Sequence, residues 1–560
     1  MYIPATIEEV KARKWDALDV ILVTGDAYID SPYIGVSVIG HVLMDAGYRV
    51  GIIAQPDVQS ERDITRLGEP ELFWGVTAGC MDSLISNYTS TKKRRKEDDL
   101  TPGGENNMRP NRASIVYTGL IRQFFKKTAS IVLGGMEASL RRVAHFDHWS
   151  NGLRRSLLFD AKADLLIYGM AERSVLELAG TLKENGDYRT IRGLCFKSDT
   201  VPEDYLALPS WKEVSEDKAK FTEMFHRFYR NQDPETARGL YQKHDQKYLI
   251  NNPPSFSLSP RELDRVYELP YEQDLHPVDK KKGHVRAMET IRFSITTHRG
   301  CFGECHFCSI PAHQGRKVVS RTEASILREA SRFADHPRFK GVIRDVGGPT
   351  ANMFGIQCRQ SNTAGCCPDK RCLYPKVCPA LKPDHSFQIR VLDRLRQLPH
   401  VRKVFIASGL RHDLITGDLH SGEEYLKRVI RHHSSGQLKV APEHSEDDVL
   451  RLMGKPGNRV LLKFKDLFDR LNRTLRKKQY LTYYFIAAHP GCSMRHMIEL
   501  KKFARNVLRM KPEQVQIFTP SPSTYSTLMF YTGLNPFGNE KIVVEREMGK
   551  MEKQKKSITG

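Results

Sequence analysis

The feature that most constrains the fold of this chain is an alternation of short apolar segments with helical stretches in its second half. Parallel strands need long crossover connections, and helices usually supply them, so this alternation is typical of parallel β/α architecture. The six segments are TIRFSITTH (290–298), GVIRDVGG (341–348), VRKVFIASG (401–409), GQLKVAPEH (436–444), YLTYYFIAAHPG (480–491) and QVQIFTPSPST (514–524). They predict a parallel barrel, complete or partial, whose active face is formed by the strand ends.

The first 195 residues show a related pattern. Residues 18–54 contain an apolar run, a turn-rich loop, a helical stretch and a second apolar run, which is a βαβ signature. Apolar strands that end in small residues follow at 72–79, 129–139 and 163–182. We therefore expect an open, Rossmann-like α/β sheet, with a ligand crevice at the carboxyl ends of its strands.

Two other segments lack this alternation. Residues 89–112 are polar and rich in turn formers, which predicts an exposed, mobile loop. Residues 196–285 carry proline pairs and charge runs, as a connector would. The predicted organisation is an N-terminal α/β domain at 1–195, a connector at 196–285, a barrel core at 286–540 and a basic tail at 541–560.

Charge and cysteine content indicate compartment and partners. The chain has 87 Lys and Arg against 66 Asp and Glu, a formal net charge of +21, which favours polyanionic partners such as RNA. We find no apolar run of membrane-spanning length and no signal-like start, so we expect a cytoplasmic protein with no membrane partner. Cysteines stay reduced in a cytoplasm, so the 11 cysteines favour metal or redox roles over disulfides.

Three of these cysteines follow the first barrel segment directly. The stretch THRGCFGECHFCSIPAHQGR places Cys301, Cys305 and Cys308 in the spacing C-x3-C-x2-C. Three thiolates on one short loop can each ligate one iron of a [4Fe–4S] cluster, which leaves the fourth iron without a protein ligand. The spacing therefore predicts a cluster with one open iron.

Other interpretations of the same loop stay open. A zinc ion could take the three sulfurs and one imidazole, from His298, His306 or His313. A thioredoxin-like pair is disfavoured, because a third cysteine precedes the C-x-x-C and the motif follows a barrel-type strand.

The triad, with the aromatic residue Phe307 before its last cysteine, resembles the signature of radical S-adenosylmethionine (SAM) enzymes. In that superfamily the open iron binds the amino and carboxylate groups of SAM. One electron from the cluster then cleaves SAM to methionine and a 5′-deoxyadenosyl radical, which abstracts hydrogen from the substrate. The resemblance implies a [4Fe–4S] cluster and SAM as cofactors, and an electron donor such as flavodoxin or ferredoxin.

Further matches to that superfamily follow at later strand ends. Gly347, Gly348 and Pro349 stand where it has a Gly-Gly-Glu-type turn that holds the SAM amino group; here proline replaces the acidic residue, so that contact would be main-chain only. Ser408 stands at the position of the ribose contact. Glu443 lies on a segment similar to the fifth-strand region of methylthiotransferase-like members.

Nearly the whole chain resembles the uncharacterised YgiQ-type radical SAM proteins, through VTGDAYIDSP, GGMEASLRR, YGMAERS and CLYP. The resemblance implies cofactor chemistry but neither a substrate nor a catalytic residue. We expect a radical SAM enzyme of unknown substrate, with modification of RNA or protein as one candidate activity. The alternative is a nucleic-acid-binding protein with structural zinc sites.

The role of the first domain stays open. Many radical SAM proteins bind cobalamin in an N-terminal open α/β domain, and the strand-end glycines Gly134 and Gly135 resemble that arrangement. Such domains often carry an Asp-x-His-x-x-Gly loop, whereas GDAYIDSPYIG has Asp26 and Asp30 and no histidine. Cobalamin without imidazole ligation and a domain that only shapes the substrate entrance are both compatible with this sequence.

A second cysteine-rich stretch, CRQSNTAGCCPDKRCLYPKVC at 358–378, follows the predicted SAM-binding turn and is expected to be an insertion on the active face. Three of its cysteines and one of an adjacent pair could form a four-sulfur site. An auxiliary iron–sulfur cluster, a structural zinc and free or redox-active thiols are the alternatives. Its five cysteines are Cys358, Cys366, Cys367, Cys372 and Cys378.

Overall fold

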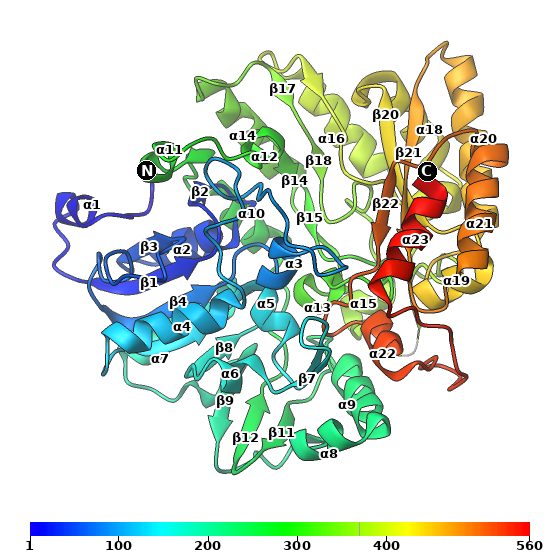
Figure 1. Cartoon of the computed structure of the whole chain (residues 1–560). Helices are drawn as coiled ribbons and strands as arrows, with labels where there is room; N and C mark the ends of the chain where they lie inside the picture. Colours follow the sequence, from blue (N-terminus) through cyan, green and yellow to red (C-terminus); the bar gives the residue numbers. More distant parts are fainter. Residues whose placement is uncertain (369, 560) are drawn as a thin grey trace. The chain divides into compact units, whose positions relative to one another are not determined.

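The computed structural model describes residues 1–368 and 370–559, and the chain divides into two compact units (Figure 1). Unit 1 comprises Met1–Leu258 and Arg265–Arg292, and unit 2 comprises Ser259–Asp264 and Phe293–Gly560. Each unit has its own buried hydrophobic core, as expected for a chain of this length. No helix in the described part of the chain is both long and apolar enough to cross a membrane.

Unit 1 is built on a nine-stranded mixed sheet in the order β10-β11-β12-β9-β8-β5-β4-β1-β3. The five strands from β3 to β8 in this order are parallel, as the βαβ pattern predicts, and β9 and β12 then pair antiparallel. The nine strands are β1 (Leu18–Thr24), β3 (Val50–Ala54), β4 (Pro70–Thr77), β5 (Ser130–Leu133), β8 (Leu165–Ile167), β9 (Leu194–Ser198), β10 (Leu206–Leu208), β11 (Leu240–His244) and β12 (Lys247–Asn251).

Helices and short strand pairs complete unit 1. The longer helices are α2 (Gly35–Asp45), α4 (Ala113–Phe124), α7 (Glu172–Lys183) and α9 (Lys218–Arg230). The shorter ones are α1 (Ile7–Ala12), α3 (Ser83–Asn87), α5 (Gly135–Leu140), α6 (Leu157–Asp160), α8 (Trp211–Glu216), α11 (Pro277–Lys280), α12 (Met288–Ile291) and the 3₁₀ turn η1 (Tyr188–Thr190). The small strand pairs are β2 (Ile29–Asp30) with β13 (Asp274–Leu275), and β6 (His145–Asp147) with β7 (Gly152–Arg154).

Two segments of unit 1 bear on the sequence predictions. Strands β10, β11 and β12 come from the stretch set apart as a connector, and they hydrogen-bond into the sheet; the boundaries at 195 and 285 stay predictions. The expectation that loop 89–112 is exposed is wrong for a few of its residues, among them Thr101, Asn106 and Arg109. Arg109 is buried there because its guanidinium lies 2.6 Å from an Asp26 carboxylate oxygen and 2.8 Å from one of Asp98.

Unit 2 carries six parallel strand positions in chain order, which confirms the predicted β/α pattern. Pairs β14–β18, β17–β19, β20–β21 and β21–β22 are all parallel, and a bridge between Leu410 and Val440 continues the pairing. The strands are β14 (Ile295–Thr296), β15 (His298–Arg299), β16 (Val319–Ser320), β17 (Val342–Ile343), β18 (Val346–Gly347), β19 (Lys403–Val404), β20 (Gln437–Glu443), β21 (Tyr480–Ala487) and β22 (Gln514–Ile517).

Helices connect these strands. The longer ones are α14 (Glu323–Arg332), α16 (Ser386–Gln397), α20 (Asn458–Thr474), α21 (Met494–Phe503), α22 (Tyr525–Thr532) and α23 (Met548–Thr559). The shorter ones are α13 (Ile310–Gln314), α15 (Arg359–Thr363), α17 (His412–Gly417), α18 (Gly422–Arg428), α19 (Asp447–Met453) and the single turns η2 (Phe333–Asp335), η3 (Val429–His433) and η4 (Ala504–Leu508). Helix α10 (Pro260–Glu268) contains residues of both units.

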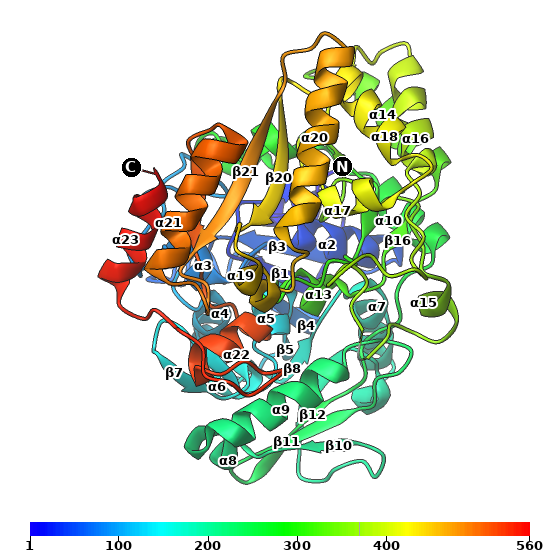
Figure 2. The same cartoon turned by 90° about the vertical axis from the view of Figure 1, so that its right-hand side faces the viewer.

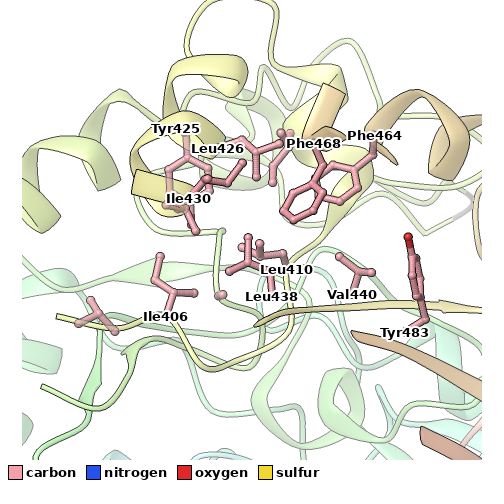
Figure 3. Close-up of a cluster of buried hydrophobic side chains, with 14 of the residues drawn as sticks. Ile406, Leu410, Tyr425, Leu426, Ile430, Leu438, Val440, Phe464, Phe468 and Tyr483 are labelled. Atoms are coloured by element: carbon pink, nitrogen blue, oxygen red, sulfur yellow. The ribbon is translucent and has the colours of Figure 1, made fainter. Parts of the chain in front are cut away.

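The core of unit 2 follows from two periodicities. Helix α20 buries Leu461, Phe464, Phe468 and Leu471, which recur at three- and four-residue intervals and so share one face. It runs alongside β20 and β21 (Figure 2). Alternate residues of β20 point to the same side, and Figure 3 shows Leu438 and Val440 facing the helical side chains. This packing holds the carboxyl end of β20 in place.

The basic C-terminal stretch forms a helix. Helix α23 buries Met551, Gln554 and Ile558. The amide oxygen of Gln554 accepts a hydrogen bond of 3.0 Å from the Ala488 backbone N–H, just after β21 ends. The segment predicted as a tail is thus anchored to a strand end of unit 2.

Candidate functional site

The three-cysteine loop begins where strand β15 ends. The antiparallel pair β15–β16 sets its entry, and Gly300 starts the loop with a positive φ of 82°. A Cβ at Gly300 would lie 2.0 Å from the Lys317 carbonyl oxygen, so only glycine fits there. The Cys308 N–H donates to the Cys305 carbonyl at 3.0 Å, which folds the loop back on itself.

The thiols of this loop influence one another, and Cys301 is buried while Cys305 and Cys308 are partly buried. Burial raises the pKa of Cys308, and the neighbouring Cys305 and Cys301 thiolates raise it further. Burial also raises the pKa of Cys301, while the Arg411 charge opposes that shift. Free thiolates are therefore costly here, and positively charged metal would compensate them. The donor set fits an iron–sulfur cluster.

A single metal ion would need ligands that converge on one point. Within residues 1–368 and 370–559, no three His, Cys, Asp or Glu side chains converge closely enough to hold one ion. In a cubane cluster each thiolate binds a separate iron, so the thiols need only face one shared volume.

Arg411 is a cation in direct contact with a thiol of this loop, and sequence reasoning missed it. Its guanidinium donates to the Cys305 sulfur at 3.3 Å and is held from the other side by the Asp413 carboxylate, with an Nε to Oδ1 distance of 2.9 Å. A Cβ at Gly303 would lie 2.9 Å from an Arg411 nitrogen, so glycine permits this approach. The segment LRHD, in which three polar residues follow Leu410 just after a strand position, could have indicated Arg411 as a site residue.

Asn352 ties the Arg411 loop to the neighbouring strand end, and it was also missed. Its side chain accepts from the Arg411 backbone N–H at 2.7 Å and donates to the Arg411 carbonyl at 3.1 Å. The Asn352 amide also lies 3.1 Å from His385 Nε2, and the other ring nitrogen of His385 pairs with Asp418 at 2.7 Å. These buried contacts fix the loops after β18 and β19 to each other.

The predicted SAM-binding turn lies beside the cysteine loop. Gly347 ends β18, and its carbonyl accepts from the Thr297 N–H at 2.6 Å. A Cβ at Gly348 would lie 2.6 Å from the His298 ring, which explains a small residue there. Pro349 follows, half-buried, and the Thr350 hydroxyl lies 3.9 Å from the Cys301 sulfur.

The other three predicted residues, Glu443, Ser408 and Phe307, have different surroundings. Glu443 ends β20 with a φ of 72°, buried near Cys308. Burial raises the pKa of Glu443, with Lys455 and Arg411 opposing. The Ser408 hydroxyl instead donates to Asp345, which holds the loop after β19. The Phe307 ring packs edge-on against His489, with 6.3 Å between centroids.

Glu304 connects the cysteine loop to the cysteine-rich insertion. Its buried carboxylate pairs with Arg316 at 2.9 Å and with Arg371 at 3.1 Å. Arg371 belongs to the insertion and also donates to the Glu304 carbonyl at 2.8 Å, while Arg316 donates to the Cys367 carbonyl at 2.8 Å. The insertion is thus fastened to the residue that precedes Cys305.

The strand ends of unit 1 are filled by side chains of unit 1. Asp26, just after β1, accepts from the Cys80 N–H at 2.6 Å as well as from Arg109. A Cβ at Gly79 would lie 2.2 Å from the Asp26 carboxylate. The crevice expected at these ends therefore holds a buried ion pair, and cobalamin stays an untested alternative.

Comparison with known proteins gives consistent matches. A family model described as Radical SAM N-terminal matches residues 2–294, and one described as Radical SAM superfamily matches residues 295–504. A UPF0313 protein from Fusobacterium nucleatum is 54% identical over 100% of this chain and 98% of its own length. UPF0313 proteins from Thermotoga neapolitana (47%; 100% of this chain, 98% of the relative) and Methanosarcina acetivorans (45%; 98% and 76%) are also similar.

Two solved structures share the fold at low identity. The radical SAM methyltransferase TsrM from Kitasatospora setae, with cobalamin and a [4Fe–4S] cluster bound, has a TM-score of 0.52 and 14% identity, covering 92% of this chain and 74% of that chain. The cobalamin-dependent SAM radical enzyme OxsB, with aqua-cobalamin bound, has a TM-score of 0.50 and 11% identity, covering 93% and 56%. These similarities concern the fold alone.

The Arg411–Asp413 pair predicts a large stability effect. Asp413→Ala leaves a buried guanidinium without its compensating charge, so we expect unit 2 to lose about 3–5 kcal/mol of unfolding free energy. Asp469→Ala breaks a Lys465 ion pair of 2.5 Å whose carboxylate is 46% exposed, and should cost less than about 1 kcal/mol. All four tryptophans lie in unit 1, so hydrogen exchange of unit 2 peptides in urea is the suitable measurement.

The pH dependence of that effect has a definite sign. Burial raises the pKa of Asp413, but the charge and hydrogen bonds of Arg411 outweigh burial, so the pKa lies well below its usual value. A carboxyl group whose pKa is lowered in the folded state stabilises the fold at pH values above its unfolded-state pKa of about 4. This contribution is lost as the pH falls. The difference between parent and Asp413→Ala should therefore shrink below about pH 4; equal losses in the two aspartate variants at neutral pH would contradict the assignment.

Proposed function

This chain belongs to the UPF0313 family of radical SAM proteins, and we propose that Cys301, Cys305 and Cys308 hold its [4Fe–4S] cluster. It is a radical SAM enzyme, and that family implies a [4Fe–4S] cluster and SAM as cofactors. When bound, the cluster supplies the electron that cleaves SAM to methionine and a 5′-deoxyadenosyl radical. The observation that carries the ligand assignment is the folded loop, which brings three mutually interacting, buried or partly buried thiols together at a strand end.

Arg411 supports this assignment through its contact with a cluster ligand. A cluster held by three thiolates concentrates negative charge in a buried site, and the guanidinium offsets part of that charge. Hydrogen bonds to ligand sulfurs also shift cluster reduction potentials. Since Asp413 fixes the guanidinium, we propose that Arg411 positions Cys305 and tunes the potential.

Glu443 supports the placement of SAM. Its buried carboxylate makes no hydrogen bond or ion pair with any residue in the described part of the chain, and Lys455 nearby donates to the Ala441 carbonyl at 2.6 Å. A buried carboxylate without a direct partner is costly unless a cation joins it. SAM carries an ammonium and a sulfonium, so we propose that Glu443 faces the cationic part of SAM.

Three further features complete the proposed SAM site. The Gly347–Gly348–Pro349 turn offers main-chain groups close to the cysteine loop, and small residues keep that approach open. Ser408 orders the loop after β19 through Asp345, where we propose that the ribose lies. Phe307 would form part of the wall that excludes water.

For the substrate we propose a chemical class. The net charge of +21 supports an anionic macromolecule, so modification of RNA is our first candidate and modification of a protein the second. Radical SAM enzymes need a reductant, and we propose flavodoxin or ferredoxin as the donor class. Membership of an enzyme family removes the basis for a purely nucleic-acid-binding protein with structural zinc.

The ligand assignment predicts the loss of SAM cleavage. Cys301→Ala, Cys305→Ala and Cys308→Ala should each abolish 5′-deoxyadenosine formation after anaerobic reconstitution, because one iron loses its protein ligand. Cys195→Ala, at a buried and free cysteine of strand β9, is the matched control and should keep parent activity. Parent-level cleavage in any of the three loop variants would show that the ligands are wrongly assigned.

The Glu443 proposal predicts opposite effects on stability and on binding. Because burial raises the pKa of Glu443, the folded state favours the protonated side chain. The fold is therefore most stable below the unfolded-state pKa of about 4.5 and loses stability as the pH rises. Glu443→Gln should therefore raise the melting temperature at pH 7, by about 2–4 °C for each kcal/mol recovered, with no gain near pH 4. The same variant should weaken SAM binding in equilibrium dialysis.

Glu513→Gln, at an exposed position before β22, is the control and should change neither property. A Glu443→Gln variant that is stabilised but binds SAM as tightly as the parent would remove Glu443 from the SAM site.

A further inference from the structure

Three cysteines of the insertion pack into one apolar cluster, although they are separated along the chain. Cys358 is buried in this hydrophobic cluster, and Cys372 and Cys378 pack against it. We call these three residues the second cysteine set. The apolar residues of the cluster are Phe302, Val318, Met353, Ile356, Leu373, Leu381 and Leu414, and Cys301 of the first loop belongs to the same cluster.

The backbone brings these three thiols together. Cys358 stands at the N-terminus of α15, and the chain returns with a turn in which the Cys378 N–H donates to the Cys372 carbonyl at 2.8 Å. The Leu381 N–H then donates to the Cys378 carbonyl at 3.0 Å, and Leu381 is fully buried. Packing of Leu373 and Leu381 therefore fixes both ends of the turn that carries two of the thiols.

Polar contacts fasten the insertion beside these cysteines. Arg371, the residue before Cys372, lies 3.1 Å from the buried Glu304 carboxylate, and Arg316 lies 2.9 Å from the same carboxylate. Thiols bind metal as thiolates, and a bound metal compensates their charge in apolar surroundings.

Simpler explanations account for these cysteines less well. No disulfide joins any of the five insertion cysteines. Valine or alanine would fill an inert apolar cluster equally well, without oxidisable sulfur. The three cysteines pack against one apolar cluster, and no three metal-ligating side chains among the described residues converge on a single point, which suits a multi-iron cluster better than one zinc ion.

We propose that Cys358, Cys372 and Cys378 ligate an auxiliary iron–sulfur cluster of the cubane type. The fourth ligand comes from the adjacent pair Cys366 and Cys367. Of the two, we choose Cys367, because its carbonyl accepts from Arg316, which shares the Glu304 carboxylate with Arg371, the residue before Cys372. The site is independent of the assignment of the first loop, although the two lie against one apolar cluster.

Iron counting after anaerobic reconstitution tests this proposal. The parent should hold about eight irons per chain, and a variant with Cys301, Cys305 and Cys308 all changed to alanine should keep about four. This variant changes no residue of the insertion, and of its three positions only Cys301 belongs to the apolar cluster of the second cysteine set. After reduction with dithionite it should show the electron paramagnetic resonance signal of a reduced [4Fe–4S] cluster.

The complementary variant carries Cys358→Ala, Cys372→Ala and Cys378→Ala and should keep about four irons together with SAM binding. Cys366→Ala should leave the count of the parent unchanged, whereas Cys367→Ala should reduce it. Cys195→Ala serves again as the matched control.

Three results would overturn the proposal: a first-loop variant without iron, zinc in place of iron in that variant, or a parent that holds only about four irons per chain. Failure of the first-loop assignment gives a different pattern, because the first-loop variant would then hold as much iron as the parent.

Discussion

The site in unit 2 depends on the buried pair of Arg411 and Asp413. A guanidinium removed from water is costly, and the bidentate carboxylate makes its burial tolerable. Because the carboxylate occupies two nitrogens, the remaining one is directed at the Cys305 sulfur. Gly303 must stay without a side chain to admit it. One ion pair therefore sets the position of the cluster loop and its electrostatic environment together.

A second carboxylate, that of Glu304, holds the cysteine-rich insertion against the first loop. Glu304 stands between two proposed cluster ligands and holds Arg316 and Arg371 at once, so the cysteine-rich insertion cannot shift without disturbing the first loop. The insertion is therefore fastened directly to the first loop. Unit 1 uses the same principle at its own strand ends, where Arg109 is buried between Asp26 and Asp98.

The parts of the structure that sequence predicts well are the local ones. The strand and helix pattern follows from periodicity, and the triad is close in space because it is close in the chain. The contacts of Arg411 with Cys305 and of Asn352 with Arg411 span 106 and 59 residues, and no local pattern reports such distances. The buried residues of loop 89–112 were missed for the same reason: polar residues such as Arg109 suggest exposure until Asp26 supplies a partner.

The central claim is that three thiolates of this chain leave one iron open for SAM. Electron paramagnetic resonance tests it directly in the variant that lacks Cys358, Cys372 and Cys378, where only the first loop can hold a cluster. We predict that the signal of the reduced cluster shifts when SAM is added, because SAM then binds the open iron. An identical spectrum at SAM concentrations that saturate binding would mean that no iron is open, and would contradict the account.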